Sequence, residues 1–160
     1  MIRKLVLAAA VAAPVSALAQ ELPTAPYLPL DMAATAARTA LDACAKEGHN
    51  VSVAIVARSG VTSALLRADN AGPHTVGSSL GKAFTSASMG RDTAGLANFI
   101  GGYPQNDGLR DMDSRMVIQA GGLPIRIGGA LVGGIGVGGA PSGDIDAGCA
   151  RAGLDAIGAE

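Results

Sequence analysis

The sequence predicts an α+β domain, with helices packed against a central antiparallel sheet of about five strands. Strand-like segments occur as hairpins rather than singly between helices, which favours antiparallel pairing. Segments with helical periodicity precede, separate and follow these hairpins. The 160 residues are enough for one domain with a core of its own.

The first 19 residues are typical of a cleavable secretory signal peptide. Arg3 and Lys4 give a positive start, an apolar run covers residues 5–15, and Ala17 and Ala19 are the small residues expected before a cleavage site. A membrane anchor is the alternative, but the run is shorter than the roughly 20 residues that span a bilayer. We therefore expect a periplasmic or secreted protein with a signal peptide at 1–19, an extended leader at 20–30 and a single domain at 31–160.

The charge of the mature chain argues against a nucleic-acid partner. Without Arg3 and Lys4, 10 basic and 13 acidic residues remain, a net charge of −3. Nucleic-acid binding proteins usually carry a basic stripe instead. No second apolar run is long enough to span a membrane after processing.

The first half of the domain is predicted to contain a helix, a hairpin and two further helices. Three prolines keep the leader extended, and Asp31 is a candidate cap for a helix over residues 32–46. The β-branched alternation of residues 51–56 predicts a strand, which a turn at 58–60 connects to a second strand at 61–67. Helices are predicted over 75–90 and 93–100.

The second half is predicted to contain an exposed excursion, three strands and a last helix. Glycine, proline, asparagine and aspartate are frequent over residues 101–113, as in a loop. A short strand at 116–118 and a hairpin of 123–127 with 130–137 follow. Asp144 is a candidate cap for the final helix, 145–157.

Cys44 and Cys149 are the only cysteines in the sequence, and both lie on apolar helical stripes. An even number of cysteines in an exported chain favours a disulfide, whereas two separate buried thiols are the alternative. A Cys44–Cys149 disulfide would place the first and last helices side by side on one face of the sheet.

The glycine-rich segment 134–139 formally matches GxGxxG, but its position in the last strand does not fit a dinucleotide-binding unit. Close packing of a strand against a helix is the interpretation that we favour. Asp107, Asp111 and Asp113 lack the spacing and the glutamate of an EF-hand. No nucleophile elbow or catalytic carboxylate pair is evident, so the residues do not predict an enzyme.

His74 is the most informative polar residue, because imidazole is a common ligand of iron and zinc. A histidine that only hydrogen-bonds the backbone at a helix start is the alternative. His49 lies between a helix and a strand and is interpreted as structural. Lys82 could present a cation to a carboxylate or be a solvated surface group, and Arg58 and Arg67 could clamp an anion or face water.

Five segments occur in an order that is specific in combination: residues 51–60, 67–71, 82–87, 121–125 and 133–140. Together they resemble the GlcG/HbpS-like haem-binding family, which is related to the partner domain of a corrinoid adenosyltransferase. The resemblance covers residues 30–157. It implies a profilin-like or Roadblock-like α/β/α sandwich, a homo-oligomer, and haem or another tetrapyrrole as the ligand. His74 would then hold the metal, and Arg67 or Lys82 would pair with propionates.

The resemblance therefore predicts a non-enzymatic, exported haem or tetrapyrrole binder for storage, sensing or delivery. Two alternatives remain: an accessory subunit of a periplasmic pathway, and an enzyme that degrades haem or acts on another small molecule.

Overall fold

The computed structural model describes residues 21–160, so the predicted signal peptide lies outside the described residues. The leader is extended up to Pro29, and Leu28 is its one buried side chain among residues 21–29. The elements are α1 (Leu30–Lys46), β1 (Ser52–Ala57), β2 (Thr62–Arg67), α2 (His74–Met89), α3 (Thr93–Gly102), the 3-10 helix η1 (Pro104–Asp111), β3 (Gly122–Ile127), β4 (Ala130–Gly138) and α4 (Gly143–Asp155).

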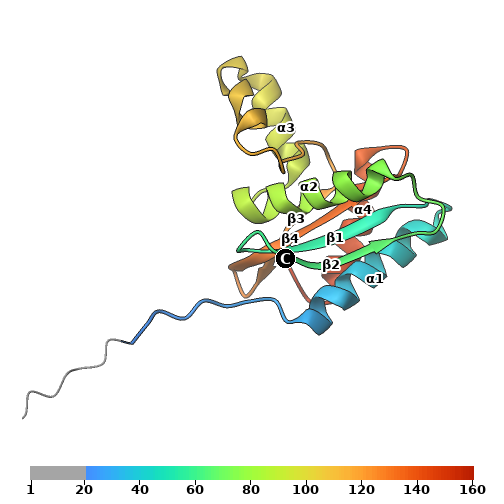
Figure 1. Ribbon diagram of the computed structural model, residues 1–160, viewed down its shortest axis with the longest axis horizontal. Coiled ribbons are helices and arrows are strands. Elements are labelled where there is room, and N and C mark those ends of the chain that lie inside the picture. The colour runs from blue at the N-terminus through green and yellow to red at the C-terminus, as the bar shows by residue number, and fades with distance from the viewer. Residues whose placement is uncertain (1–20) are drawn as a thin grey trace, which may run out of the picture.

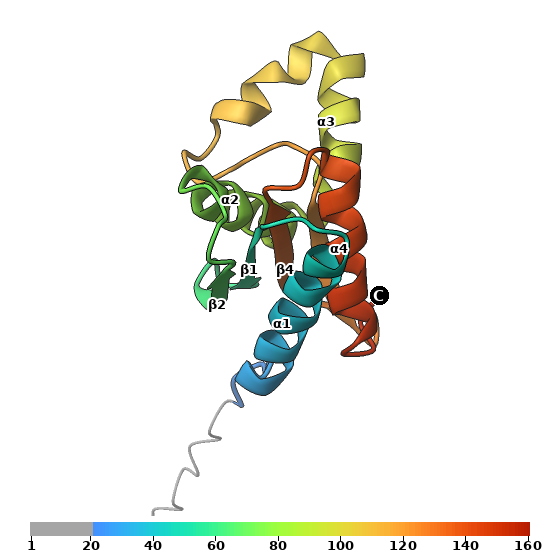
Figure 2. The same cartoon turned by 90° about the vertical axis from the view of Figure 1, so that its right-hand side faces the viewer.

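The strands form one antiparallel sheet in the order β2-β1-β4-β3. The two hairpins meet at its centre, where Ile55 of β1 lies opposite Ile135 of β4. Helices α1 and α4 cover one face and α2 covers the other, while α3 and η1 extend away from the sheet (Figures 1 and 2). The predicted α+β architecture, with helices on both faces, is confirmed.

The prediction of a fifth strand at residues 116–118 is wrong, because the sheet of the described chain has four strands. The backbone of this segment binds α2 instead of a strand. The Val117 N–H donates to Thr85 Oγ1 at 3.0 Å and to the Gly81 carbonyl at 3.4 Å. Gly81 allows this approach, since a Cβ there would lie 2.3 Å from Val117 Cγ2.

The two predicted aspartate caps are also wrong, although both helices form. Helix α1 begins at Leu30, inside the predicted leader, with Pro29 before it, and Asp31 lies in its first turn. Its first hydrogen bond runs from the Ala33 N–H to the Pro29 carbonyl at 3.0 Å. In α4 the capping oxygen is that of Ser142, which accepts from the Ile145 N–H at 3.3 Å. Serine caps a helix as well as aspartate does, so composition alone does not fix the start.

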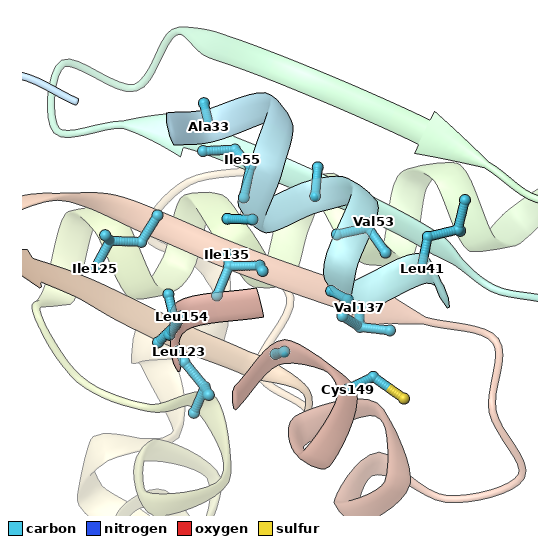
Figure 3. Close-up of a cluster of buried hydrophobic side chains, with 14 of the residues drawn as sticks. Ala33, Leu41, Val53, Ile55, Leu123, Ile125, Ile135, Val137, Cys149 and Leu154 are labelled. Atoms are coloured by element: carbon cyan, nitrogen blue, oxygen red, sulfur yellow. The ribbon is translucent and has the colours of Figure 1, made fainter. Parts of the chain in front are cut away.

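The larger core lies between the sheet and the pair α1/α4 and consists of aliphatic side chains (Figure 3). The Cys44–Cys149 disulfide joins the two helices, with 5.5 Å between the Cα atoms, so the predicted bridge and the predicted neighbours are confirmed. Small residues let the helices approach closely. A Cβ on Gly153 of α4 would lie 2.5 Å from the Ala36 carbonyl oxygen of α1.

The glycines of β4 serve close packing, as the sequence predicts. A Cβ on Gly134 would lie 2.4 Å from the Ala83 carbonyl oxygen of α2, and one on Gly136 would lie 2.2 Å from that of Ser79. The backbone of α2 therefore rests directly on β4. This contact fixes the depth at which α2 lies on the sheet.

Replacing Gly136 with Ala is expected to destabilise the fold by about 1–3 kcal/mol or more, because the new methyl group meets backbone that cannot rotate away. Denaturant unfolding measures the change. Gly148 of α4 is the matched control, since a Cβ there meets no atom within 4 Å. Gly148→Ala should instead stabilise by about 0.5–1 kcal/mol. Equal effects of the two substitutions would contradict the packing role of Gly136.

Candidate ligand-binding site

A pocket of about 260 Å³ lies between α2, the β1–β2 turn and the segment 114–117. Three aliphatic side chains from three parts of the chain line it: Val56 of β1, Leu80 of α2 and Val117. Gly77 and Gly81 keep the helix side of the pocket free of bulk. The pocket thus offers an apolar surface that is open along one face of α2.

A second pocket of about 140 Å³ continues the first toward the end of α2. Gly60, Phe84 and Arg115 line both pockets. The second pocket adds polar groups, which belong to Arg58, Ser59 and Ser88. We call the two pockets together the α2 groove; it is apolar at one end and polar and cationic at the other.

Arg115 lies at the junction of the two pockets. Its guanidinium carbon is 4.0 Å from the centroid of the Phe84 ring, a cation–π arrangement. Asp113 binds the same group from the side, with Oδ1 2.9 Å from Nε and Oδ2 2.6 Å from Nη2. These hydrogen bonds lower the pKa of Asp113 to about 2, and they raise the pKa of Arg115. Both groups therefore stay charged at any physiological pH.

Arg58 closes the end of the groove. Its Nη1 donates to the carbonyl oxygens of Ala87 and Ser88, at 3.0 and 3.3 Å, in the last turn of α2. These carbonyls lack partners within the helix, and a cation at this end also matches the helix dipole. Arg58 is thus fixed by the fold while it lines the polar pocket.

His74 is the first residue of α2 and is exposed. It lies one helical turn before Gly77, which lines the groove, so the two share a helix face. The imidazole lies over Gly72, where a Cβ would be 2.7 Å from its Cε1. His74 therefore precedes the groove by one helical turn, and it is not one of the residues that line the two pockets.

Arg67 and Lys82 lie apart from this groove. Arg67 donates to the Ala71 carbonyl and lines a different depression, of about 410 Å³, together with Arg38. Lys82 is buried, and its Nζ donates to Asp146 Oδ2 at 2.8 Å and to the Val137 carbonyl at 2.9 Å. The three residues predicted as ligand contacts are therefore not brought together.

Within residues 21–160, no three side chains of His, Cys, Asp or Glu are close enough to hold a metal ion together. Asp107 binds Arg110 and Asp113 binds Arg115.

His49 lies just after α1, where its backbone N–H donates to the Cys44 carbonyl at 3.0 Å. None of the helices within residues 21–160 is long and apolar enough to cross a membrane.

Comparison with known proteins places the chain in a family. Residues 28–155 match the model of the family described as "Haem degrading protein HbpS-like". A double mutant of HbpS from Streptomyces reticuli is 45% identical, with a TM-score of 0.80 over 91% of this chain and 97% of that chain. The chain belongs to the HbpS-like family.

Two more distant structures show that the fold is shared more widely than the sequence. Protein ORFY of Klebsiella pneumoniae is 24% identical, with a TM-score of 0.81 over 89% of this chain and 98% of that chain. The haem complex of PduOC is also 24% identical, with a TM-score of 0.75 over 84% of this chain and 98% of that chain. No curated protein matches the chain.

Two of the five segments that resemble the HbpS-like family, 51–60 and 82–87, contribute residues to the groove. Residues 51–60 form β1 and its turn, residues 82–87 lie in α2, and residues 133–140 include most of β4. Phe84 and Arg115, which line both pockets of the groove, were not predicted from the sequence. Phe84 is one of only four aromatic residues of the chain, which was a usable signal. Arg115 lies in an irregular segment, and nothing local marks it.

Proposed function

We propose that this HbpS-like protein binds haem or a related tetrapyrrole outside the cytoplasm, for storage, sensing or delivery and without chemical change. Membership of a family whose description names haem carries the proposal. The PduOC complex supports it as well, since that protein of the same fold was solved with haem. The α2 groove is the proposed binding site, because an apolar pocket beside two guanidinium groups suits a flat apolar macrocycle with acidic substituents.

His74 is the proposed iron ligand. His74 is exposed and lies one helical turn before Gly77, which lines the apolar pocket, so this role requires its imidazole to turn from Gly72 toward Gly77. Neither Arg67, in its separate depression, nor Lys82, in its internal ion pair, is needed for binding in this groove. Lys82 would act only through the position of α2.

Titration of the mature protein with haemin is expected to shift the Soret band with a defined stoichiometry. His74→Ala should weaken binding and change the band, because the iron loses its nitrogen ligand. His49→Ala is the matched control, since it removes the other histidine of the sequence. An unchanged spectrum of the wild type at stoichiometric haemin would refute haem binding. Equal spectra of wild type and His74→Ala would refute only the ligand assignment.

Export is part of the proposal, and the Cys44–Cys149 disulfide supports it, because such bonds persist in oxidising compartments. Cleavage after Ala19 would leave Gln20 as the first residue. N-terminal sequencing of the protein recovered from the periplasm or medium should begin at this residue. Recovery of an intact Met1 from the cytoplasm would contradict both the cleavage and the location.

Haem degradation is a second candidate, favoured by the family description. It predicts that the Soret band of bound haemin decays faster with a reductant and oxygen than the band of free haemin, whereas a protein that only binds haem would preserve the band.

We also propose a homo-oligomer, which light scattering tests directly. The exposed pair of Phe99, on the projecting α3, and Tyr103, between α3 and η1, supports this proposal.

A further inference from the structure

The two edges of the Arg115 guanidinium are engaged differently. Asp113 binds the edge formed by Nε and Nη2. Nη1 lies on the other side, toward Gly60, where a Cβ would be 3.8 Å from it. Among the described residues, no hydrogen bond involves Nη1. One edge of the group is therefore fixed by the protein, and the other faces the groove.

The flat face of the guanidinium is held as well, since it lies over the Phe84 ring at 4.0 Å. The backbone N–H of Arg115 also donates to Asp113 Oδ1 at 2.9 Å, which ties the carboxylate to the same short segment. The Arg115 side chain nevertheless stays 62% exposed, so a ligand can reach it. A cation that is both oriented and accessible is prepared to bind an anion without a further loss of side-chain entropy.

The surroundings of Nη1 favour a carboxylate in particular. The smaller pocket is lined by Arg58, Ser59 and Ser88 in addition to Arg115, and no carboxylate lines it among residues 21–160. Its polar lining groups are mostly hydrogen-bond donors, two guanidinium groups and two hydroxyls. Its volume of about 140 Å³ suits a small group and not a whole macrocycle. The apolar pocket of about 260 Å³ directly adjoins it.

We propose that the smaller pocket of the α2 groove selects ligands that carry a free carboxylate. Arg115 is the residue that recognises this carboxylate, and Asp113 is the positioning residue that orients Arg115. This inference rests on the proposed function and narrows it to a chemical class, namely macrocycles with ionised acid side chains, with or without a metal. The ligand is anchored at two ends: its acid group by Arg115 and its apolar body by Val56, Leu80 and Val117.

The test compares protoporphyrin IX with its dimethyl ester, both metal-free, by their fluorescence on titration with the mature protein. The ester has the same ring, but two neutral methyl ester groups replace the ionised carboxylates. Wild type should bind the acid at least tenfold more tightly than the ester. Arg115→Gln should weaken binding of the acid by about tenfold to a hundredfold, the usual effect of one charge-assisted hydrogen bond. Binding of the ester should not change.

Asp113→Asn tests the positioning role separately. It keeps Arg115 but weakens the hydrogen bonds that orient the guanidinium. The affinity for the acid should therefore fall by about threefold to tenfold, while the affinity for the ester should not change. The pair Asp107 and Arg110 is the matched control, because it is also an exposed contact between aspartate and arginine, at 3.1 Å. Asp107→Asn and Arg110→Gln should change neither affinity.

Equal binding of acid and ester by wild type, or equal losses for both with Arg115→Gln, would overturn the role of Arg115 while haem binding stands. Tighter binding of the acid by Asp113→Asn would show that Asp113 competes with the ligand instead of positioning Arg115. Failure of wild type to bind haemin and both porphyrins would overturn the proposed function together with this inference.

Discussion

Replacing Lys82 with Met is expected to lower the free energy of unfolding by about 3–5 kcal/mol, because it leaves a buried carboxylate without its partner. The Lys82 and Asp146 side chains are 2% and 4% exposed, and Nζ and Oδ2 are 2.8 Å apart. The other carboxylate oxygen accepts from the Ala140 N–H at 3.0 Å. Asp146 would thus remain held in place by the backbone while it loses its counter-charge. Urea unfolding followed by circular dichroism measures the loss.

The exposed pair of Arg38 and Asp42 is the control for this prediction. Its atoms are 3.8 Å apart and its side chains are 61% and 55% exposed, so water screens their attraction. Arg38→Gln should change stability by less than about 1 kcal/mol. If Lys82→Met also lowers the free energy of unfolding by less than about 1 kcal/mol, Asp146 must be hydrated or protonated at little cost, and the predicted penalty for an unpaired buried carboxylate is wrong.

A double-mutant cycle separates the pair from its surroundings. Asp146→Asn keeps an oxygen for the Ala140 N–H and removes the charge, so the variant with both Lys82→Met and Asp146→Asn buries no unpaired ion. The free energy of unfolding that the double variant loses should be clearly smaller than the sum of the losses in the two single variants. Additive losses would mean that the two side chains act independently.

The elements of the fold could be predicted because their causes are local. The alternation of residues 51–56 and the glycine turn after them depend on neighbours in sequence, and the β1–β2 hairpin formed as expected. Residues 116–118 were mistaken for a strand because a short apolar run does not show which backbone will bind it. The partner of Val117 is α2, more than 30 residues earlier in the chain.

The site was less predictable, since its residues gain their roles from distant partners. Lys82 was predicted either to pair with a ligand propionate or to be a solvated surface group, whereas in the structure it pairs with Asp146 of the same chain, 64 residues away. In sequence, a lysine among small residues in a helix is indistinguishable from a surface lysine. Arg115 and Phe84 form the junction of the groove only after the segment 114–117 crosses α2. The glycines of β4, by contrast, were interpreted correctly because close packing explains several glycines in one strand.

Removing the disulfide by Cys44→Ala together with Cys149→Ala is expected to cost about 4–5 kcal/mol in the chain-entropy model, because the bond closes a long loop in the unfolded chain. The two residues are 105 positions apart in sequence. Both cysteines are buried, so alanine is preferable to serine, which would bury a hydroxyl. The melting temperature should fall by roughly 10–20 °C for a domain of this size.

The native contacts of α1 and α4 should survive this double substitution, since alanines and Gly153 pack the helices without the sulfur atoms. The far-UV circular dichroism spectrum and the haemin stoichiometry below the transition should therefore match those of wild type. A spectrum with reduced helix content would show instead that the bond is needed to hold the helices together. A loss of stability below about 1 kcal/mol would show that the unfolded chain is already compact around these residues. Because reducing conditions remove the same bond, the reduced wild type is expected to lose stability by a similar amount.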